Sequence, residues 1–176
     1  MPAMLERYSS LRMRELWDEG RKFRTWLLIE LAALIAREEI TFEKFQWFKA
    51  DIPISPERIA ELEREFDHDM NAFIQHIREE FERLNEPRLA TILHDRLTSY
   101  DIEDPALILI LRESVTYVVE ELQRLEQTLA SKAFEHRWTL KIGRTHGQFA
   151  EPTTFGIELL MPAYFCTKNT AFSLQK

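Results

Sequence analysis

The amino-acid sequence predicts an all-α protein, and three features support this prediction. Only four glycines occur in 176 residues, and leucine, glutamate, arginine and alanine, which favour helices, are the dominant residue types. Hydrophobic residues recur at spacings of three and four over long stretches, as they do in amphipathic helices. The main exception is residues 140–155, where weak alternation of polar and apolar residues predicts a short, hairpin-like extended segment.

The first long helix is expected at residues 10–39, with a break near Gly20. Glu30 falls on its apolar face by helical angle, and buried charges are normally paired. We therefore expect Glu30 to pair with a nearby arginine or lysine. The residues that form this apolar stripe are Phe23, Trp26, Leu27, Leu31, Leu34 and Ile35.

A second, one-sided amphipathic helix is expected at residues 56–84. Ser55 is a suitable N-cap and Pro56 suits the first helical position. His68 lies nearly opposite the apolar stripe, so packing does not explain it, and Asp69 lies at the edge of the stripe. The stripe consists of Ile59, Leu62, Phe66, Met70, Phe73, Ile77, Phe81 and Leu84.

A third helix is expected to begin at Asp104–Pro105 and to run for about 30 residues, or roughly 45 Å. Its apolar residues repeat at about 3.5 residues, the period of helical bundles, so it needs partners along its length. Pro162 makes a further helix after residue 156 a poor one. We expect an N-terminal helical domain at residues 1–103 and the truncated start of a long-helix bundle at residues 104–176.

Composition excludes several classes of function. A net charge of −7 argues against a broad nucleic-acid-binding surface. The lone Cys166 permits no internal disulfide, which favours a reducing compartment. The N-terminus lacks the apolar core of a signal peptide, and the apolar runs are too short to span a bilayer. We expect a cytoplasmic protein that binds neither nucleic acid nor membrane.

Four polar clusters interrupt the helices, at residues 6–8, 67–73, 94–101 and 143–156. Thr98 and Ser99 precede a helix start, where such residues most often act as caps. His146 stands in "RTHGQ", among flexible or turn-forming residues, where it gains nothing for folding. Loops on rigid scaffolds often carry chemistry, so His146 is the stronger functional candidate.

Taken together, the clusters resemble the N-terminal part of the adenylosuccinate lyases, in the fumarase/aspartase superfamily. The resemblance runs through "RYSS", "MRELWDEGRKFRTWLLIE", "HDMNAF", "LTSYDIEDPAL" and "GRTHGQFAEPTTFG", and covers nearly all of residues 5–160. It implies β-elimination of fumarate from a succinylated purine nucleotide, either adenylosuccinate or the earlier carboxamide intermediate of purine synthesis. It also implies a homotetramer whose active sites each combine three subunits, with no cofactor and no metal.

The resemblance also implies a role for each site residue. A base removes a proton next to a carboxylate, and an acid protonates the departing nitrogen; histidine suits the acid because its pKa is near 6.5. Hydroxyl and amide donors placed beforehand stabilise the doubly charged carboxylate. The implied proton donor is His146, helped by the second catalytic residue His68; the implied substrate-binding residues are Arg7 and Tyr8 at the phosphate, Asp67, His68 and Asp69 beside the catalytic histidine, and Thr98, Ser99, Thr145 and Gln148.

The sequence departs from the family pattern in three ways. Asp67 stands where the family often has arginine, and its charge would repel a phosphate. Arg96 replaces a glycine and would restore positive charge if its side chain points into the pocket. The serine loop that supplies the family's base, resembling "GSSxMPxKxNP", is absent from a chain less than half the family's length. We expect the chain alone to have little or no lyase activity.

Two other interpretations use the same residues. The pairs His68–Asp69 and His94–Asp95 are compatible with a metal-dependent phosphohydrolase of the HD type, with imidazole and carboxylate ligands. Alternatively, the long helix is only an oligomerisation module and the chain is not an enzyme.

Overall fold

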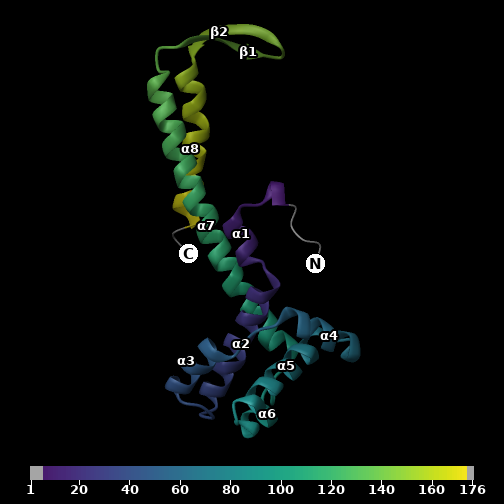
Figure 1. Ribbon diagram of the computed structural model, residues 1–176. Coiled ribbons are helices and arrows are strands. Elements are labelled where there is room, and N and C mark those ends of the chain that lie inside the picture. Colours follow the sequence, from purple (N-terminus) through teal and green to yellow (C-terminus); the bar gives the residue numbers. More distant parts are fainter. Residues whose placement is uncertain (1–5, 174–176) are drawn as a thin grey trace. The chain divides into compact units, whose positions relative to one another are not determined.

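The computed structural model describes residues 6–173, and its first compact unit ends at Glu113. This unit contains the 3₁₀ turn η1 (Glu6–Tyr8) and the start of helix α7 (Ser99–Glu135) (Figure 1). The remaining helices of the unit are α1 (Leu11–Leu16), α2 (Glu19–Ala36), α3 (Phe42–Asp51), α4 (Pro56–Phe66), α5 (Asp69–Arg83) and α6 (Pro87–Ile92).

The core of this unit is aromatic. The rings of Phe23 and Phe73 stack at 6.0 Å, and Trp26 meets both rings edge-on. Phe48 and Phe81 make a second edge-on contact at 5.1 Å, and both side chains are fully buried. Each such side chain contributes about 1.5–3 kcal/mol when it is removed from water. The buried face of α2 is the apolar stripe predicted from the sequence, and Glu30 lies within it.

The first predicted helix is divided at Trp17–Asp18, close to the break expected near Gly20. The Asp18 carboxylate accepts a hydrogen bond from the Gly20 N–H at 2.9 Å and caps α2. The short helix α1 is capped by Ser10 in the same way. Helix α3, which the sequence analysis did not predict, begins at the cap Thr41 and buries Phe45 and Phe48.

The prediction of one continuous helix at residues 56–84 is wrong. Asp67 adopts the left-handed conformation, with φ of 48°, and its N–H donates to the Glu63 carbonyl at 2.8 Å. His68 is extended and precedes the first residue of α5. The apolar spacing continues across the break, so it concealed the change of direction.

The predicted start of the long helix is also wrong. Helix α7 begins at Ser99, before Asp104 and Pro105, and Pro105 lies inside it. The Thr98 N–H and hydroxyl both donate to the Asp101 carboxylate, at 2.7 and 2.9 Å, and this interaction forms the helix start. Beyond Glu113, α7 continues into the second compact unit. The predicted domain division after residue 103 stays a prediction.

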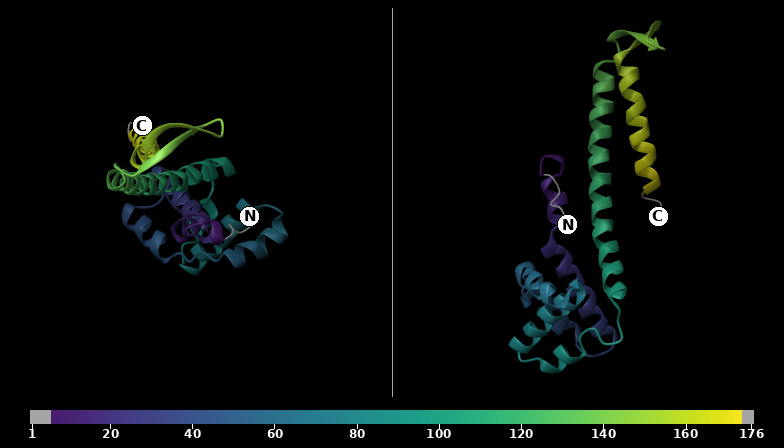
Figure 2. Two further views of the ribbon diagram at one scale, coloured as in Figure 1. Left: turned by 90° about the horizontal axis from the view of Figure 1, so that it is seen from above. Right: turned by 90° about the vertical axis from the view of Figure 1, so that its right-hand side faces the viewer.

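The second unit contains the end of α7, an antiparallel hairpin and helix α8 (Phe155–Ser173). The strands β1 (Leu140–Thr145) and β2 (Gln148–Thr154) confirm the predicted hairpin, with a register shift at Gly143. From the hairpin, α8 runs back beside the end of α7 (Figure 2). It is a regular helix despite Pro162, contrary to our expectation.

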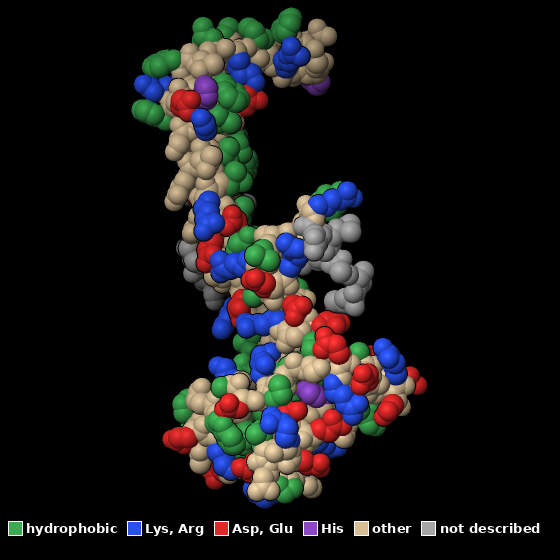
Figure 3. Space-filling view, viewed as in Figure 1, with side chains coloured by type: hydrophobic (Ala, Val, Ile, Leu, Met, Phe, Trp, Pro, Cys, Tyr) green, Lys and Arg blue, Asp and Glu red, His purple; other side chains and the backbone are tan. Residues whose placement is uncertain are grey.

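The described residues thus form an all-α protein with one small two-stranded sheet, as predicted. None of their helices is both long enough and apolar enough to cross a membrane. In Figure 3, acidic and basic side chains are interspersed over the first unit, whereas hydrophobic side chains gather along the hairpin and the helices of the second.

Candidate active site

His68 and Asp69 lie at the start of α5, where the chain turns. The His68 Nδ1 is 3.8 Å from Asp69 Oδ1, and 47% of the His68 side chain is exposed. Asp69 is held on both sides: its Oδ1 accepts the Met70 N–H at 2.8 Å, and its Oδ2 lies 3.2 Å from the Lys22 ammonium. A carboxylate in the first turn is also favoured by the helix dipole.

Lys22 was not identified from the sequence. Its ammonium lies 4.3 Å from the centre of the Trp26 ring, in cation–π geometry, and it ties α2 to the start of α5. The signal for it was weak, because a lysine near an apolar stripe most often projects into solvent.

The connector between α6 and α7, residues 93–98, is unusual in its backbone. His94 and Arg96 both have positive φ angles, of 65° and 61°. His94 Nδ1 lies 2.6 Å from Oε1 of Glu30, which is fully buried. The expectation that Glu30 would pair with an arginine or lysine is therefore wrong, because its partner is a histidine. Burial raises the pKa of Glu30, and the nearby His94 opposes this effect.

Thr98 and Ser99 follow the connector at the start of α7. Because the Thr98 hydroxyl donates to Asp101, a substrate carboxylate would have to compete with Asp101 for that donor. The hydrogen bond from the Thr98 N–H, which has the larger effect, and the one from the Thr98 hydroxyl both hold the pKa of the Asp101 carboxyl below its usual value. Arg96 is exposed and its Nε lies 3.6 Å from Asp95 Oδ2.

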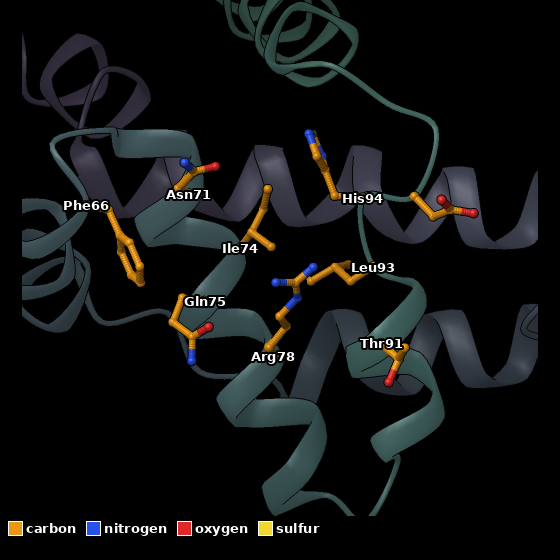
Figure 4. Close-up of a pocket in the computed structure, with 9 residues that line it drawn as sticks. Phe66, Asn71, Ile74, Gln75, Arg78, Thr91, Leu93 and His94 are labelled. Atoms are coloured by element: carbon orange, nitrogen blue, oxygen red, sulfur yellow. The ribbon is translucent and has the colours of Figure 1, made fainter.

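A pocket of about 350 Å³ lies between α5 and the connector. Arg78 reaches into it from α5, and its Nε donates to the Ala90 carbonyl at 3.1 Å (Figure 4). Neither His68 nor Thr98 lines this pocket. Its lining residues are Phe66, Asn71, Ile74, Gln75, Arg78, Thr91, Leu93, His94 and Asp95.

Arg7 and Tyr8 lie in η1, and both side chains are exposed. The Arg7 guanidinium is 4.8 Å from the centre of the Tyr8 ring. Asp67 is exposed at the end of α4, where its backbone terminates the helix. Among the described residues of the first unit, no hydrogen bond joins these side chains to His68, Thr98 or Ser99.

The hairpin of the second unit carries the other predicted site residues. Thr145 and Gln148 face each other, and His146 and Gly147 form the turn between them, with φ of 49° and 75°. Positive φ at both positions is typical of a type I′ hairpin turn, in which glycine is favoured second. His146 is exposed at the tip, so its imidazole is accessible to a ligand or to another chain.

The side chains required by the phosphohydrolase interpretation have other partners. His94 pairs with Glu30, and Asp95 lies 3.7 Å from Arg37. Within residues 6–173, no three histidine, cysteine, aspartate or glutamate side chains lie close enough to hold a metal ion together.

Comparison with known proteins identifies the family. A family model described as "Lyase" matches residues 54–172, which include the α4–α5 break, the connector and the hairpin. The chain belongs to this lyase family. The resemblance inferred from the sequence strings is thereby confirmed.

Two curated relatives of this lyase-family chain are adenylosuccinate lyases. The protein from Synechocystis sp. is 35% identical over 159 residues, which is 89% of this chain and 36% of the relative. The protein from Bacillus subtilis is 35% identical over 161 residues, 90% of this chain and 36% of the relative. The chain therefore spans about a third of the length of the relatives it matches.

A solved structure has the same fold. The crystal structure of fumarate lyase from Mesorhizobium sp. matches with a TM-score of 0.80 and 21% identity, over 96% of this chain and 40% of that one. At this identity the likeness concerns the fold alone. It supports the all-α fold described above.

Proposed function

We propose that this chain is part of a C–N lyase of the adenylosuccinate lyase type. The reaction is β-elimination of fumarate from adenylosuccinate or from its carboxamide-ribotide analogue. The 35% identity to two adenylosuccinate lyases over nine-tenths of the chain carries this proposal.

In the proposed reaction, His146 protonates the departing nitrogen. A base first removes the proton from the carbon beside the carboxylate, and the electron pair of that C–H bond becomes the C=C bond of fumarate. The breaking C–N bond leaves its electron pair on nitrogen, and the imidazolium of His146 supplies the proton to that nitrogen. Histidine suits this step because it holds and releases a proton near neutral pH. The exposed position of His146, in the turn between β1 and β2, supports this role.

In the proposed oligomer, the hydroxyls of Thr98, Ser99 and Thr145, contributed by the subunits that share a site, are proposed to bind the carboxylate that gains charge in the reaction. Preorganised donors stabilise such charge more than mobile water does. The Thr98 hydroxyl donates to Asp101 in the free chain, and substrate binding is proposed to exchange that hydrogen bond for one to the substrate carboxylate. Gln148, opposite Thr145 in the hairpin, is proposed to face the same ligand.

In the proposed oligomer, whose sites combine several subunits, the pair His68–Asp69 is proposed to position and charge the catalytic histidine, and Lys22 holds Asp69 in place. Arg7 and Tyr8 are proposed to contact the nucleotide phosphate. Asp67 precedes His68 at the end of α4, and its charge disfavours a phosphate close to it.

The protein is further proposed to be a cytoplasmic homo-oligomer, a tetramer at full length, that needs no cofactor. Large apolar side chains of the second unit support association, because they are more than one-third exposed. These residues are Val115, Val118, Leu125, Phe134, Ile157, Leu160, Met161, Tyr164 and Phe165. The boundary between an N-terminal domain and a bundle domain is proposed at residues 103–104.

A chimera tests the proposed function. The matching third of the Bacillus subtilis adenylosuccinate lyase is replaced by this chain, so that the remaining two-thirds of that protein completes the molecule. We expect the chimera to release fumarate from adenylosuccinate, as measured by NMR. This chain alone and the truncated partner alone are the controls.

The chimera must also fold and assemble, which circular dichroism and light scattering establish. A folded chimera that binds adenylosuccinate but releases no fumarate would contradict the proposed function. Parallel turnover of the carboxamide analogue then ranks the two substrates.

A further inference from the structure

Glu30 is a buried carboxylate that the proposed reaction does not use. It lies on the apolar face of α2, between fully buried leucines, and has no exposed surface. Its Oε1 lies 2.6 Å from His94 Nδ1, and its Oε2 has no hydrogen-bond partner among the described residues. Because burial of a carboxylate is unfavourable, packing alone does not explain this residue.

Arg37 makes a second contact from α2 to the same segment. It is the C-cap of the helix, and its guanidinium donates to the carbonyls of Asp95, at 2.7 Å, and Ile92, at 3.1 Å. Arg37 therefore binds backbone carbonyls at the start of the connector, and Glu30 binds the imidazole of His94. The charged groups around Glu30 are His94 and Arg37, with Asp95 next to Arg37.

The connector has a conformation that needs such support. His94 and Arg96 both occupy the left-handed region, which is unfavourable for residues other than glycine. Strained backbone of this kind persists where the surrounding structure determines it, and such sites are often functional.

The connector determines how α7 begins. Its Asp95 N–H donates to the Ile92 carbonyl and its Leu97 N–H to the His94 carbonyl, both at 3.2 Å. The Thr98 N–H then donates to Asp101. The backbone between His94 and Ser99 is thus held in place by these hydrogen bonds.

We propose that Glu30 is a positioning residue, which holds the His94 ring and thereby fixes the connector that presents Thr98 and Ser99 to the substrate. The contact with substrate rests on the proposed function. The contact between Glu30 and the connector does not rest on the proposed function, so this contact and its effect on substrate are tested separately.

Amide hydrogen exchange of this chain tests the hold. In Glu30→Gln, we expect the amides of Asp95, Leu97 and Thr98 to exchange at least about ten-fold faster, because local opening becomes easier. Amides of α4 and α5 should keep their rates. Unchanged connector rates, or equal acceleration in α4 and α5, would overturn the proposal.

Two further variants make the result specific. Glu30→Met removes the carboxylate and keeps the volume, and buried charges replaced in this way often leave a fold intact; it should also accelerate connector exchange. Glu39→Gln is the matched control, because Glu39 pairs with Arg88 outside the connector. It should leave connector exchange unchanged, and acceleration equal to that in Glu30→Gln counts against the proposal.

Turnover of the chimera tests the consequence for substrate. Glu30→Gln should raise the KM for adenylosuccinate and lower kcat, each by about ten-fold, whereas Glu39→Gln changes neither. Unchanged kcat and KM in an active chimera would overturn the role in positioning. An inactive parent chimera contradicts the proposed function instead, and hydrogen exchange then decides whether Glu30 holds the connector.

Discussion

Asp67 and His68 separate two helices that the sequence pattern joins into one. Asp67 ends α4 with φ of 48°, and His68 enters α5 in an extended conformation with φ of −156°. The two helices pack against each other across this turn. As a result His68 stands at a corner, beside Asp69, rather than along the face of a rod.

The left-handed Asp67 predicts a stabilising substitution. Glycine adopts this conformation without the steric penalty of a side chain, so Asp67→Gly should raise the free energy of unfolding by about 1 kcal/mol. Glu65→Gly is the control, since Glu65 lies inside α4, where glycine should lower stability by about 1 kcal/mol. Urea denaturation measures both. Equal destabilisation by the two substitutions would contradict the left-handed turn.

Gly156 predicts a destabilising substitution in the second unit. A Cβ there would meet the carbonyl of Ala133 and lie 2.8 Å from Cα of Arg137. Gly156→Ala should therefore lower the free energy of unfolding by about 1–3 kcal/mol, as overpacking does.

The control for this prediction is Gly147→Ala at the hairpin tip. No heavy atom lies within 4 Å of its added Cβ, so only the strain of positive φ remains, about 1 kcal/mol. Thermal unfolding followed by circular dichroism compares the two variants. A fully tolerated Gly156→Ala would contradict the close approach of α7 and α8.

The Thr98–Asp101 contact predicts a pH dependence. The folded state lowers the pKa of Asp101, so it binds fewer protons there than the unfolded state. The stabilisation is therefore complete above the ordinary aspartate pKa and is lost as the pH falls through the lowered value.

Comparison of the wild type with Asp101→Asn isolates this contribution. The difference in their free energies of unfolding, from urea titrations at several pH values, should be largest near neutrality and should shrink on acidification. Thr98→Val, which removes the hydroxyl donor and keeps the Asp101 carboxylate, should weaken this pH dependence. A difference that stays constant with pH would contradict the contact.

The exposed apolar surface of the second unit predicts association. Val118 and Leu125 are 46% and 48% exposed on α7. We expect the chain to self-associate at micromolar concentration, and Val118→Glu with Leu125→Glu to shift it towards the monomer, because charge disfavours burial. Analytical ultracentrifugation measures the shift. Gln123→Glu adds a charge without removing an apolar group and serves as the control; a monomeric wild type would contradict this prediction.

Much of the fold followed from the sequence by simple physical rules. The stripe from Phe23 to Leu34 is buried as its period predicts, and the hairpin lies where the helical pattern stops. The errors concern helix ends, the break between α4 and α5, the unpredicted helix α3 and the regular helix α8 that contains Pro162. Thr98 and Asp101 start α7 by side-chain capping, a stronger local effect than the Asp104–Pro105 signal.

The candidate site was only partly predictable. The strings around Thr98 and His146 were recognisable because they interrupt helical periodicity, whereas the string around His68 was recognisable only through its resemblance to the family. Glu30 and Lys22 act through partners distant in the sequence, His94 and Asp69, and periodicity carries no information about such pairs. Within an apolar stripe, a buried carboxylate indicates that a partner exists without indicating which one.

Whether His146 donates the proton is tested most directly by measuring the turnover of single-substitution variants of the active chimera. His146→Gln should lower kcat for fumarate release by about 100- to 10,000-fold with substrate affinity little changed, since general acid catalysis contributes that much. Lys141→Gln, which removes only the hairpin contact with Glu158, should leave kcat within about two-fold. A His146→Gln chimera that releases fumarate as fast as its parent would contradict the assignment.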